Sequence, residues 1–174
     1  MENRFPGRGR SRRSRTLEER FTPKPQSPLV EVAAPRAYPA RAPGGSEALL
    51  VVEDQDQVRE VARAILERLG YRVATACDGN EALRFVREGH DLDLVLTDVV
   101  LPSMNGVTLA ERIVAERSGV RVLFMSGLTS ESGVPEGSVR GEPCAFLLKP
   151  FSLDVLARAV RDLLDRTPGE IRAG

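Results

Sequence analysis

Residues 92–102 read LDLVLTDVVLP, and this stretch decides the fold. Past Asp93 it is continuously apolar until it ends in Thr97-Asp98. A short apolar run without alternation is typical of a strand that is buried on both faces, as in a parallel sheet. We therefore predict a buried strand over residues 92–97, with an aspartate directly at its carboxyl end.

Similar strands alternate with helices on both sides of this stretch. Short apolar runs predict four more strands, over residues 48–52, 71–76, 120–125 and 145–148. Apolar residues at helical spacing predict four helices, over residues 58–69, 80–88, 107–117 and 153–164. The order is therefore strand then helix, repeated along the chain.

The same alternation places a further helix between the last two strands, over residues 130–142. This segment contains Gly133, Pro135, Gly137 and Gly141, which are all poor residues for a helix interior. We expect this helix to be short, irregular or mobile.

Strands that alternate with helices at these lengths predict an α/β fold. It is a doubly wound, five-stranded parallel sheet with helices on both faces. In such a sheet, the residues that follow the strands meet at one edge, where ligands bind. The strands end in the pairs Glu53-Asp54, Thr97-Asp98, Ser126-Gly127 and Lys149-Pro150. We expect three carboxylates, a hydroxyl and an ammonium to converge there.

Charge divides the chain into two unlike parts. The 174 residues carry 25 basic and 25 acidic side chains. Residues 1–46 have a net charge of +6 and seven of the 12 prolines, whereas the remainder has a net charge of −6. An Arg- and Pro-rich segment with few large apolar residues cannot offset its ordering entropy. We predict a disordered tail or linker over 1–46, one domain over 47–166 and a short tail over 167–174.

Several classes of protein are excluded by composition. No apolar run approaches the roughly 20 residues of a membrane helix, and no apolar stretch follows the basic N-terminus as in a secretory signal. Cys77 and Cys144 have neither metal-ligand spacing nor a disulfide framework around them. The expected location is the cytoplasm.

The motifs at the strand ends, taken together, resemble a known family. Asp98 is followed by Pro102 and Asn105-Gly106, and Lys149 by Pro150-Phe151. With the other strand ends, these motifs make residues 47–166 similar to the receiver domain of two-component response regulators. That domain occurs alone or as the C-terminal receiver of a hybrid sensor histidine kinase. The resemblance implies a flavodoxin-like sheet of strand order 2-1-3-4-5.

The resemblance also implies a role for each site residue. Asp98 would accept the phosphoryl group. Mg²⁺ would be held by the carboxylates of Glu53, Asp54 and Asp98 and by the backbone carbonyl of Val100. The phosphoryl group would be contacted by Ser126 and Lys149, and Phe146 would occupy the aromatic switch position. The donor would be a phosphohistidine on a histidine kinase or a histidine phosphotransfer protein.

The chemistry explains why these residue types are needed. Neighbouring carboxylates raise one another's pKa, so Asp98 needs a cation beside it to attack as a carboxylate. Mg²⁺ prefers such hard oxygen ligands. Lys149 is the only lysine after Lys24, in a chain with 23 arginines, and a compact ammonium is not interchangeable with a guanidinium. Glu53 stands where the family more often has aspartate, and we expect it to weaken or alter Mg²⁺ binding.

Two functions remain open at this point. The first is a phosphorylatable receiver that signals through a phosphorylation-dependent protein-binding surface. Such a receiver would catalyse only its own phosphorylation and its own slow dephosphorylation, and we do not expect it to be an enzyme otherwise. The second is a pseudo-receiver that acts only as a protein-interaction module. Phosphatases of the haloacid-dehalogenase type are excluded, because they need a second acid where this chain has Val100.

The output is expected to pass through a downstream protein. Only about ten residues follow the last predicted helix, which leaves no room for a C-terminal DNA-binding domain. The Arg-rich tail could attract nucleic acid or acidic lipid electrostatically. It has no interleaved aromatic residues and no groove-reading fold, so the sequence gives nucleic-acid contact little support.

Overall fold

The computed structural model describes residues 43–127 and 137–166. Three predicted segments lie wholly or partly outside the described residues: most of the tail over 1–46, the short C-terminal tail over 167–174 and the first part of the helix over 130–142. The described elements are, in chain order, β1 (Ala48–Val52), α1 (Asp56–Arg68), β2 (Arg72–Ala76), α2 (Gly79–Arg87), β3 (Leu94–Asp98), α3 (Gly106–Glu116), β4 (Arg121–Ser126), β5 (Ser138–Val139), β6 (Glu142–Leu148) and α4 (Leu153–Leu164).

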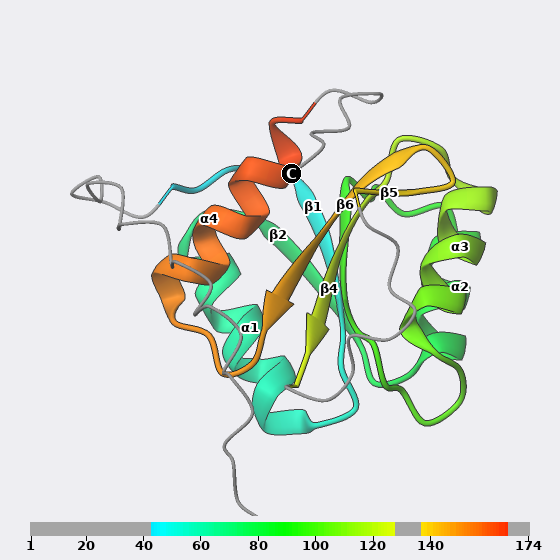
Figure 1. The fold of residues 1–174 in the computed structure, drawn as a ribbon, viewed down its shortest axis with the longest axis horizontal. Helices are drawn as coiled ribbons and strands as arrows, with labels where there is room; N and C mark the ends of the chain where they lie inside the picture. Colours follow the sequence, from blue (N-terminus) through cyan, green and yellow to red (C-terminus); the bar gives the residue numbers. More distant parts are fainter. Residues whose placement is uncertain (1–42, 128–136, 167–174) are drawn as a thin grey trace, which may run out of the picture. The chain divides into compact units, whose positions relative to one another are not determined.

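The strands form one sheet between two layers of helices (Figure 1). The strand order is β2-β1-β3-β4-β6-β5, and the first five strands are parallel to their neighbours. Helices α1 and α4 cover one face, and α2 and α3 cover the other. The predicted doubly wound sheet is confirmed, with β6 in the place of the fifth strand.

Each long strand in the middle of the sheet contributes side chains to two separate apolar cores. On β1, for example, Leu50 and Val52 pack towards α2 and α3, whereas Leu49 and Val51 pack towards α1 and α4. All five residues of β1 and of β3 are buried. Burial on both faces is the reason why these strands are apolar without alternation.

No helix among the described residues combines the length and apolar character needed to cross a bilayer.

The segment before β6 differs from the prediction. Residues 138–143 form a hairpin in which β5 pairs antiparallel with the start of β6. Its turn consists of Arg140 and Gly141, which both have a positive φ, of 50° and 91°. Two such residues make the tight turn that matches the twist of a hairpin. The prediction that a helix extends to residue 142 is therefore wrong for residues 137–142, and the last strand is three residues longer than predicted.

Gly106 allows α3 to begin against the end of β3. Its backbone N–H donates to the carbonyl of Val99 at 2.9 Å, and a Cβ at this position would lie 2.0 Å from the backbone oxygen of Asp98. That separation is far inside van der Waals contact, and the neighbouring atom is backbone that cannot turn away. The Asn105-Gly106 pair thus fixes the loop that follows Asp98.

Replacing Gly106 with alanine should destabilise the domain by about 1–3 kcal/mol, because the added methyl group has no space. Urea unfolding followed by circular dichroism measures this loss. Gly127→Ala is the matched control, since no described atom would lie within 4 Å of its Cβ, and it should change stability by less than about 0.5 kcal/mol. Equal stability of the two variants would contradict the close approach.

Cys144 is a buried thiol at the start of β6. Burial raises the pKa of the Cys144 thiol from 9.0 to about 11, against a smaller lowering by Arg166. Below pH 9 the thiol is protonated in both the folded and the unfolded chain. Between pH 9 and 11 it ionises first in the unfolded chain, so ionisation favours unfolding in that range.

The free energy of unfolding should therefore fall by about 2–3 kcal/mol between pH 9 and 11 through this one thiol. Chemical unfolding at a series of pH values measures the fall in the wild type and in Cys144→Ala. The variant should be less stable at neutral pH but should lose less stability across the alkaline range. The same pH dependence in both proteins would show that Cys144 is not protected by burial.

Candidate functional site

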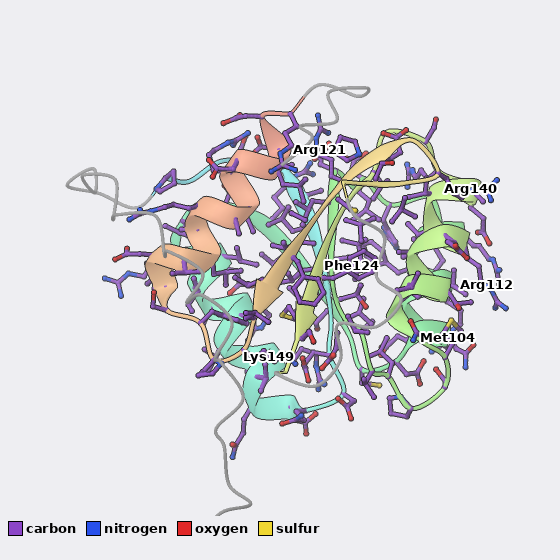
Figure 2. The ribbon with its side chains drawn as sticks, viewed as in Figure 1. Met104, Arg112, Arg121, Phe124, Arg140 and Lys149 are labelled. Atoms are coloured by element: carbon purple, nitrogen blue, oxygen red, sulfur yellow. The ribbon has the colours of Figure 1, made fainter. Side chains whose placement is uncertain are left out.

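The strand ends meet at one edge of the sheet, as the topology requires. Glu53 and Asp54 directly follow β1, Asp98 ends β3, Ser126 ends β4 and Lys149 directly follows β6. Figure 2 shows Lys149 at the lower end of the molecule, beyond the arrowheads of β4 and β6, whereas Arg121 lies at the opposite end of the sheet. The site therefore lies at the carboxyl ends of four parallel strands.

Lys149 joins two of the carboxylates. Its Nζ lies 2.5 Å from Oε2 of Glu53 and 2.6 Å from Oδ2 of Asp98, and it donates a hydrogen bond to each. The side chain of Glu53 is fully buried, and those of Asp98 and Lys149 are 11% and 18% exposed. Charge-assisted hydrogen bonds of this length are strong, and removing one partner from such a buried group is costly.

Burial and charge shift the pKa values of two of these groups. Burial raises the pKa of Glu53, and the nearby charge of Asp98 adds to this, while Lys149 acts in the opposite direction. For Lys149, burial alone would lower the pKa, but the hydrogen bonds and charges of Asp98 and Glu53 outweigh it, so its pKa is raised. Lys149 is consequently a stable ammonium at neutral pH.

Asp98 is held by its own backbone surroundings as well. Its Oδ1 accepts a hydrogen bond from the backbone N–H of Val100 at 3.0 Å, and the hydroxyl of Thr97 donates to the backbone carbonyl of Asp98 at 3.0 Å. The residue is 8% exposed. One carboxylate oxygen thus faces the loop and the other faces Lys149, which fixes the direction of the side chain.

Asp54 completes a group of three carboxylates. Glu53, Asp54 and Asp98 each place one oxygen within 4.8 Å of the others, and Asp54 is exposed to solvent. Hard carboxylate oxygens with an open side towards water match what Mg²⁺ needs, because this ion keeps several waters when it binds. The three predicted acids are therefore brought together, and their chemistry fits a small divalent cation.

The site residues belong to a longer stretch of sequence that matches a known family. A family model described as the response regulator receiver domain matches residues 49–161. The chain belongs to this family. The receiver domain thus comprises every described strand and helix from β1 to most of α4.

Two curated relatives illustrate where such domains occur. The chain is 36% identical over 126 residues to the sensor kinase CckA of Brucella abortus (strain 2308), which covers 70% of this chain and 13% of that protein. It is 35% identical over 119 residues to the aerobic respiration control protein ArcA of Escherichia coli (strain K12), which covers 68% of this chain and 49% of that protein. The chain thus spans less than half the length of either relative.

Solved structures agree with the fold. The receiver domain of the hybrid histidine kinase CckA is 34% identical with a TM-score of 0.55, and the match covers 67% of this chain and 98% of that one. A putative response regulator from Chloroflexus aurantiacus J-10-fl is 30% identical with a TM-score of 0.61, and covers 70% and 100%. The matches cover nearly the whole of both structures, so each is about the size of the described domain.

Three of the predicted site residues are not part of the cluster of three carboxylates. Ser126 is buried, and its hydroxyl donates to the backbone carbonyl of Gly127 at 2.8 Å. Phe146 is half-buried, lies opposite Phe124 on the neighbouring strand and packs against the core beneath α2 and α3. The side chain of Val100 is exposed. The roles of these residues in this receiver domain stay predictions.

Arg59 is a site residue that the sequence analysis did not single out. The N-cap residue of α1, Gln55, makes no side-chain capping bond. Instead, the guanidinium of Arg59 reaches back from within α1, donates to the backbone carbonyl of Glu53 at 2.6 Å and pairs with Asp56. A cation near the start of a helix is disfavoured by the helix dipole. The position of Arg59 in the sequence could therefore have indicated that its side chain makes a specific contact.

Arg59→Gln should destabilise the receiver domain by about 1–2 kcal/mol, because the carbonyl of Glu53 loses a charged donor. The ion pair with Asp56 contributes little to this, since Asp56 is largely exposed. Thermal unfolding measures the loss. The control is Arg68→Gln, an exposed arginine in the last turn of α1 whose side chain has no ion pair among the described residues, and it should lose only the few tenths of a kcal/mol that its charge contributes at the helix end. An equal loss in both variants would mean that Arg59 acts only through helix propensity.

Proposed function

We propose that this receiver domain accepts a phosphoryl group on Asp98 with the help of Mg²⁺. The proposal is supported above all by the Lys149 ammonium, which lies 2.6 Å from one oxygen of Asp98 while Asp54 leaves the same group of acids open to solvent. The donor is the phosphohistidine of a histidine kinase or a histidine phosphotransfer protein. The cellular location that suits this role is the cytoplasm.

Asp98 acts as the nucleophile in this proposal. An oxygen of its carboxylate forms a bond to phosphorus while the phosphorus–nitrogen bond of the donor breaks, and the electron pair stays on the imidazole nitrogen. Glu53, Asp54, Asp98 and the backbone carbonyl of Val100 would hold Mg²⁺, which when bound neutralises charge on the phosphoryl oxygens. The N–H of Val100 keeps the second oxygen of Asp98 in place.

Lys149 and Ser126 act on the phosphoryl group once it is attached. Lys149 already points at the oxygen of Asp98 and supplies a positive charge to the new phosphoryl oxygens. Ser126 would exchange its bond to the carbonyl of Gly127 for one to a phosphoryl oxygen. Contacts that exist only after phosphorylation are what shift a two-state equilibrium. Phe146 lies on the neighbouring strand, and it would respond by repacking because it has no hydroxyl.

The output in this proposal is a phosphorylation-dependent surface for a partner protein. Receiver domains occur in a relative named as a sensor kinase and in relatives named as transcriptional regulators, so the family alone does not identify the partner. The hairpin of β5 and β6 lies at the opposite end of the sheet from the site, and β6 runs from this hairpin directly into Lys149. In this proposal, a change at Lys149 reaches the hairpin along β6.

A pseudo-receiver that works without phosphorylation is the alternative. It would keep the fold and the partner surface but would not use Asp98. Nothing in the arrangement of Asp54, Asp98 and Lys149 favours it, since all three charged groups that phosphorylation needs are present and close together. Phosphorylation of the purified chain separates the two functions.

Incubation with Mg²⁺ and acetyl phosphate should add the mass of one phosphoryl group to the wild type, as measured by intact-protein mass spectrometry. Asp98→Asn should gain nothing, because an amide does not attack phosphorus. Asp91→Asn is the control, since Asp91 is an exposed aspartate paired with Arg72 at the start of β2, and it should gain one group. A wild type that gains no mass, or an Asp98→Asn variant that gains as much, would favour the pseudo-receiver.

A further inference from the structure

The segment directly before β1 is packed against the domain. Residues 44–47 lead into β1, and their backbone is hydrogen-bonded to the end of α1 and the start of β2. The N–H of Gly45 donates to the carbonyl of Leu69, the C-cap residue of α1, at 3.2 Å. The carbonyl of Glu47 accepts from the N–H of Arg72 at 3.0 Å. Carbonyls at the end of a helix lack partners within the helix, and Gly45 provides one for Leu69.

Two glycines allow this segment to lie so close to the domain. A Cβ on Gly44 would lie 2.1 Å from the backbone oxygen of Leu69. A Cβ on Gly45 would lie 2.6 Å from Cε1 of Tyr71 and 2.8 Å from Nη1 of Arg161. Glycine is the residue that permits such an approach of the backbone. The Gly44-Gly45 pair therefore serves to dock the segment, in addition to any freedom of movement that it gives the chain.

Arg161 holds the segment from the side of α4. It lies in the last turn of that helix, and its Nη1 is 2.8 Å from Oε1 of Glu47, while its Nε donates to Asp165 at 3.0 Å. Burial would raise the pKa of Glu47, but hydrogen bonds from Arg161 and from backbone N–H groups outweigh it, so this pKa is lowered. Figure 1 shows the short cyan stretch before β1 passing α4. The guanidinium thus ties the segment to the helix.

Helix α4 connects this segment with the other end of the sheet. The helix begins shortly after Lys149, and its 12 residues span about 18 Å up to the turn that carries Arg161. Its buried residues, including Leu156 and Val160, pack into the same apolar core as Tyr71. A close-packed helix of this kind shifts as a unit. A displacement of α4 therefore changes the position of Arg161 relative to the segment before β1.

We propose that residues 44–47 and Arg161 form an entry clasp, which fixes the point where the chain enters the domain and couples that point to α4. When α4 shifts, Arg161 loses Glu47 and the segment is released. The entry clasp is thus a second output surface, at the amino ends of the strands, and what responds to it is the polypeptide that precedes the domain. Its release by phosphorylation rests on the proposed function, whereas the clasp itself does not.

The test is backbone amide hydrogen exchange, followed by nuclear magnetic resonance in the full chain. In Arg161→Gln, the amide of Gly45 should exchange about tenfold faster than in the wild type, because a charge-assisted contact that holds the segment is lost. The amide of Leu96, in the middle of β3, should exchange at the wild-type rate. An unchanged rate at Gly45, or an equal acceleration at both amides, would overturn the proposal.

Two further variants separate the entry clasp from the stability of α4. Asp165→Asn removes the partner of Arg161 within the helix and keeps Glu47, so Gly45 should exchange as in the wild type. Glu47→Gln removes the other half of the contact and should act like Arg161→Gln. The two substitutions together should add little, because both break the same contact. Acceleration by Asp165→Asn equal to that by Arg161→Gln, or fully additive effects, would contradict the clasp. Glu47→Gln alone decides if Arg161→Gln fails to fold.

Beryllofluoride with Mg²⁺, a stand-in for the phosphoryl group, separates this inference from the proposed function. It should speed exchange at Gly45 in the wild type but not in Arg161→Gln, where the contact is already lost. If amides next to Asp98 do not respond, the proposed function fails, and the entry clasp stands or falls on the variants alone. If they respond while Gly45 does not, the coupling through α4 fails and the proposed function stands.

Discussion

The ammonium of Lys149, shared between the carboxylates of Glu53 and Asp98, is the interaction on which the candidate site depends. Without it, two acids with little or no exposure would face each other at the sheet edge, and nothing would oppose the burial that raises the pKa of Glu53. The contact satisfies the charge of Glu53 in the core and keeps Asp98 pointing at a cation. A doubly wound sheet makes this possible, because it brings the ends of β1, β3 and β6 to one edge.

The same arrangement leaves the site short of positive charge. Among the residues that the structure describes, three carboxylates are matched by one ammonium, and the guanidinium of Arg59 contacts the backbone of Glu53 rather than its carboxylate. A divalent cation and the phosphoryl group it accompanies would restore the balance in the proposed reaction. Asp54, which is exposed, would be the first of the three acids that such a cation meets from solvent in the proposed reaction.

Much of the sheet and of the candidate site was predictable from the sequence, and the reason is physical. Strands β1 and β3 are buried on both faces, so their apolar runs and terminal acids could be identified without a structure. The hairpin was not predicted, because the alternation of strands and helices suggested a helix where Arg140 and Gly141 form a tight turn. The hydrogen-bond partners of Lys149 were not predicted. They depend on how far side chains reach across neighbouring strands, and the sequence alone does not give that distance.

The shared ammonium can be observed directly, because the chain has only two lysines, Lys24 and Lys149. Lysine labelled with carbon-13 at Cε gives two signals by nuclear magnetic resonance, and Lys24→Arg assigns them. In metal-free protein, Lys149 should titrate with a pKa above the ordinary lysine value of 10.5, and Glu53→Gln should lower it. A Lys149 signal that titrates at or below 10.5 in the folded wild type would contradict the shared contact.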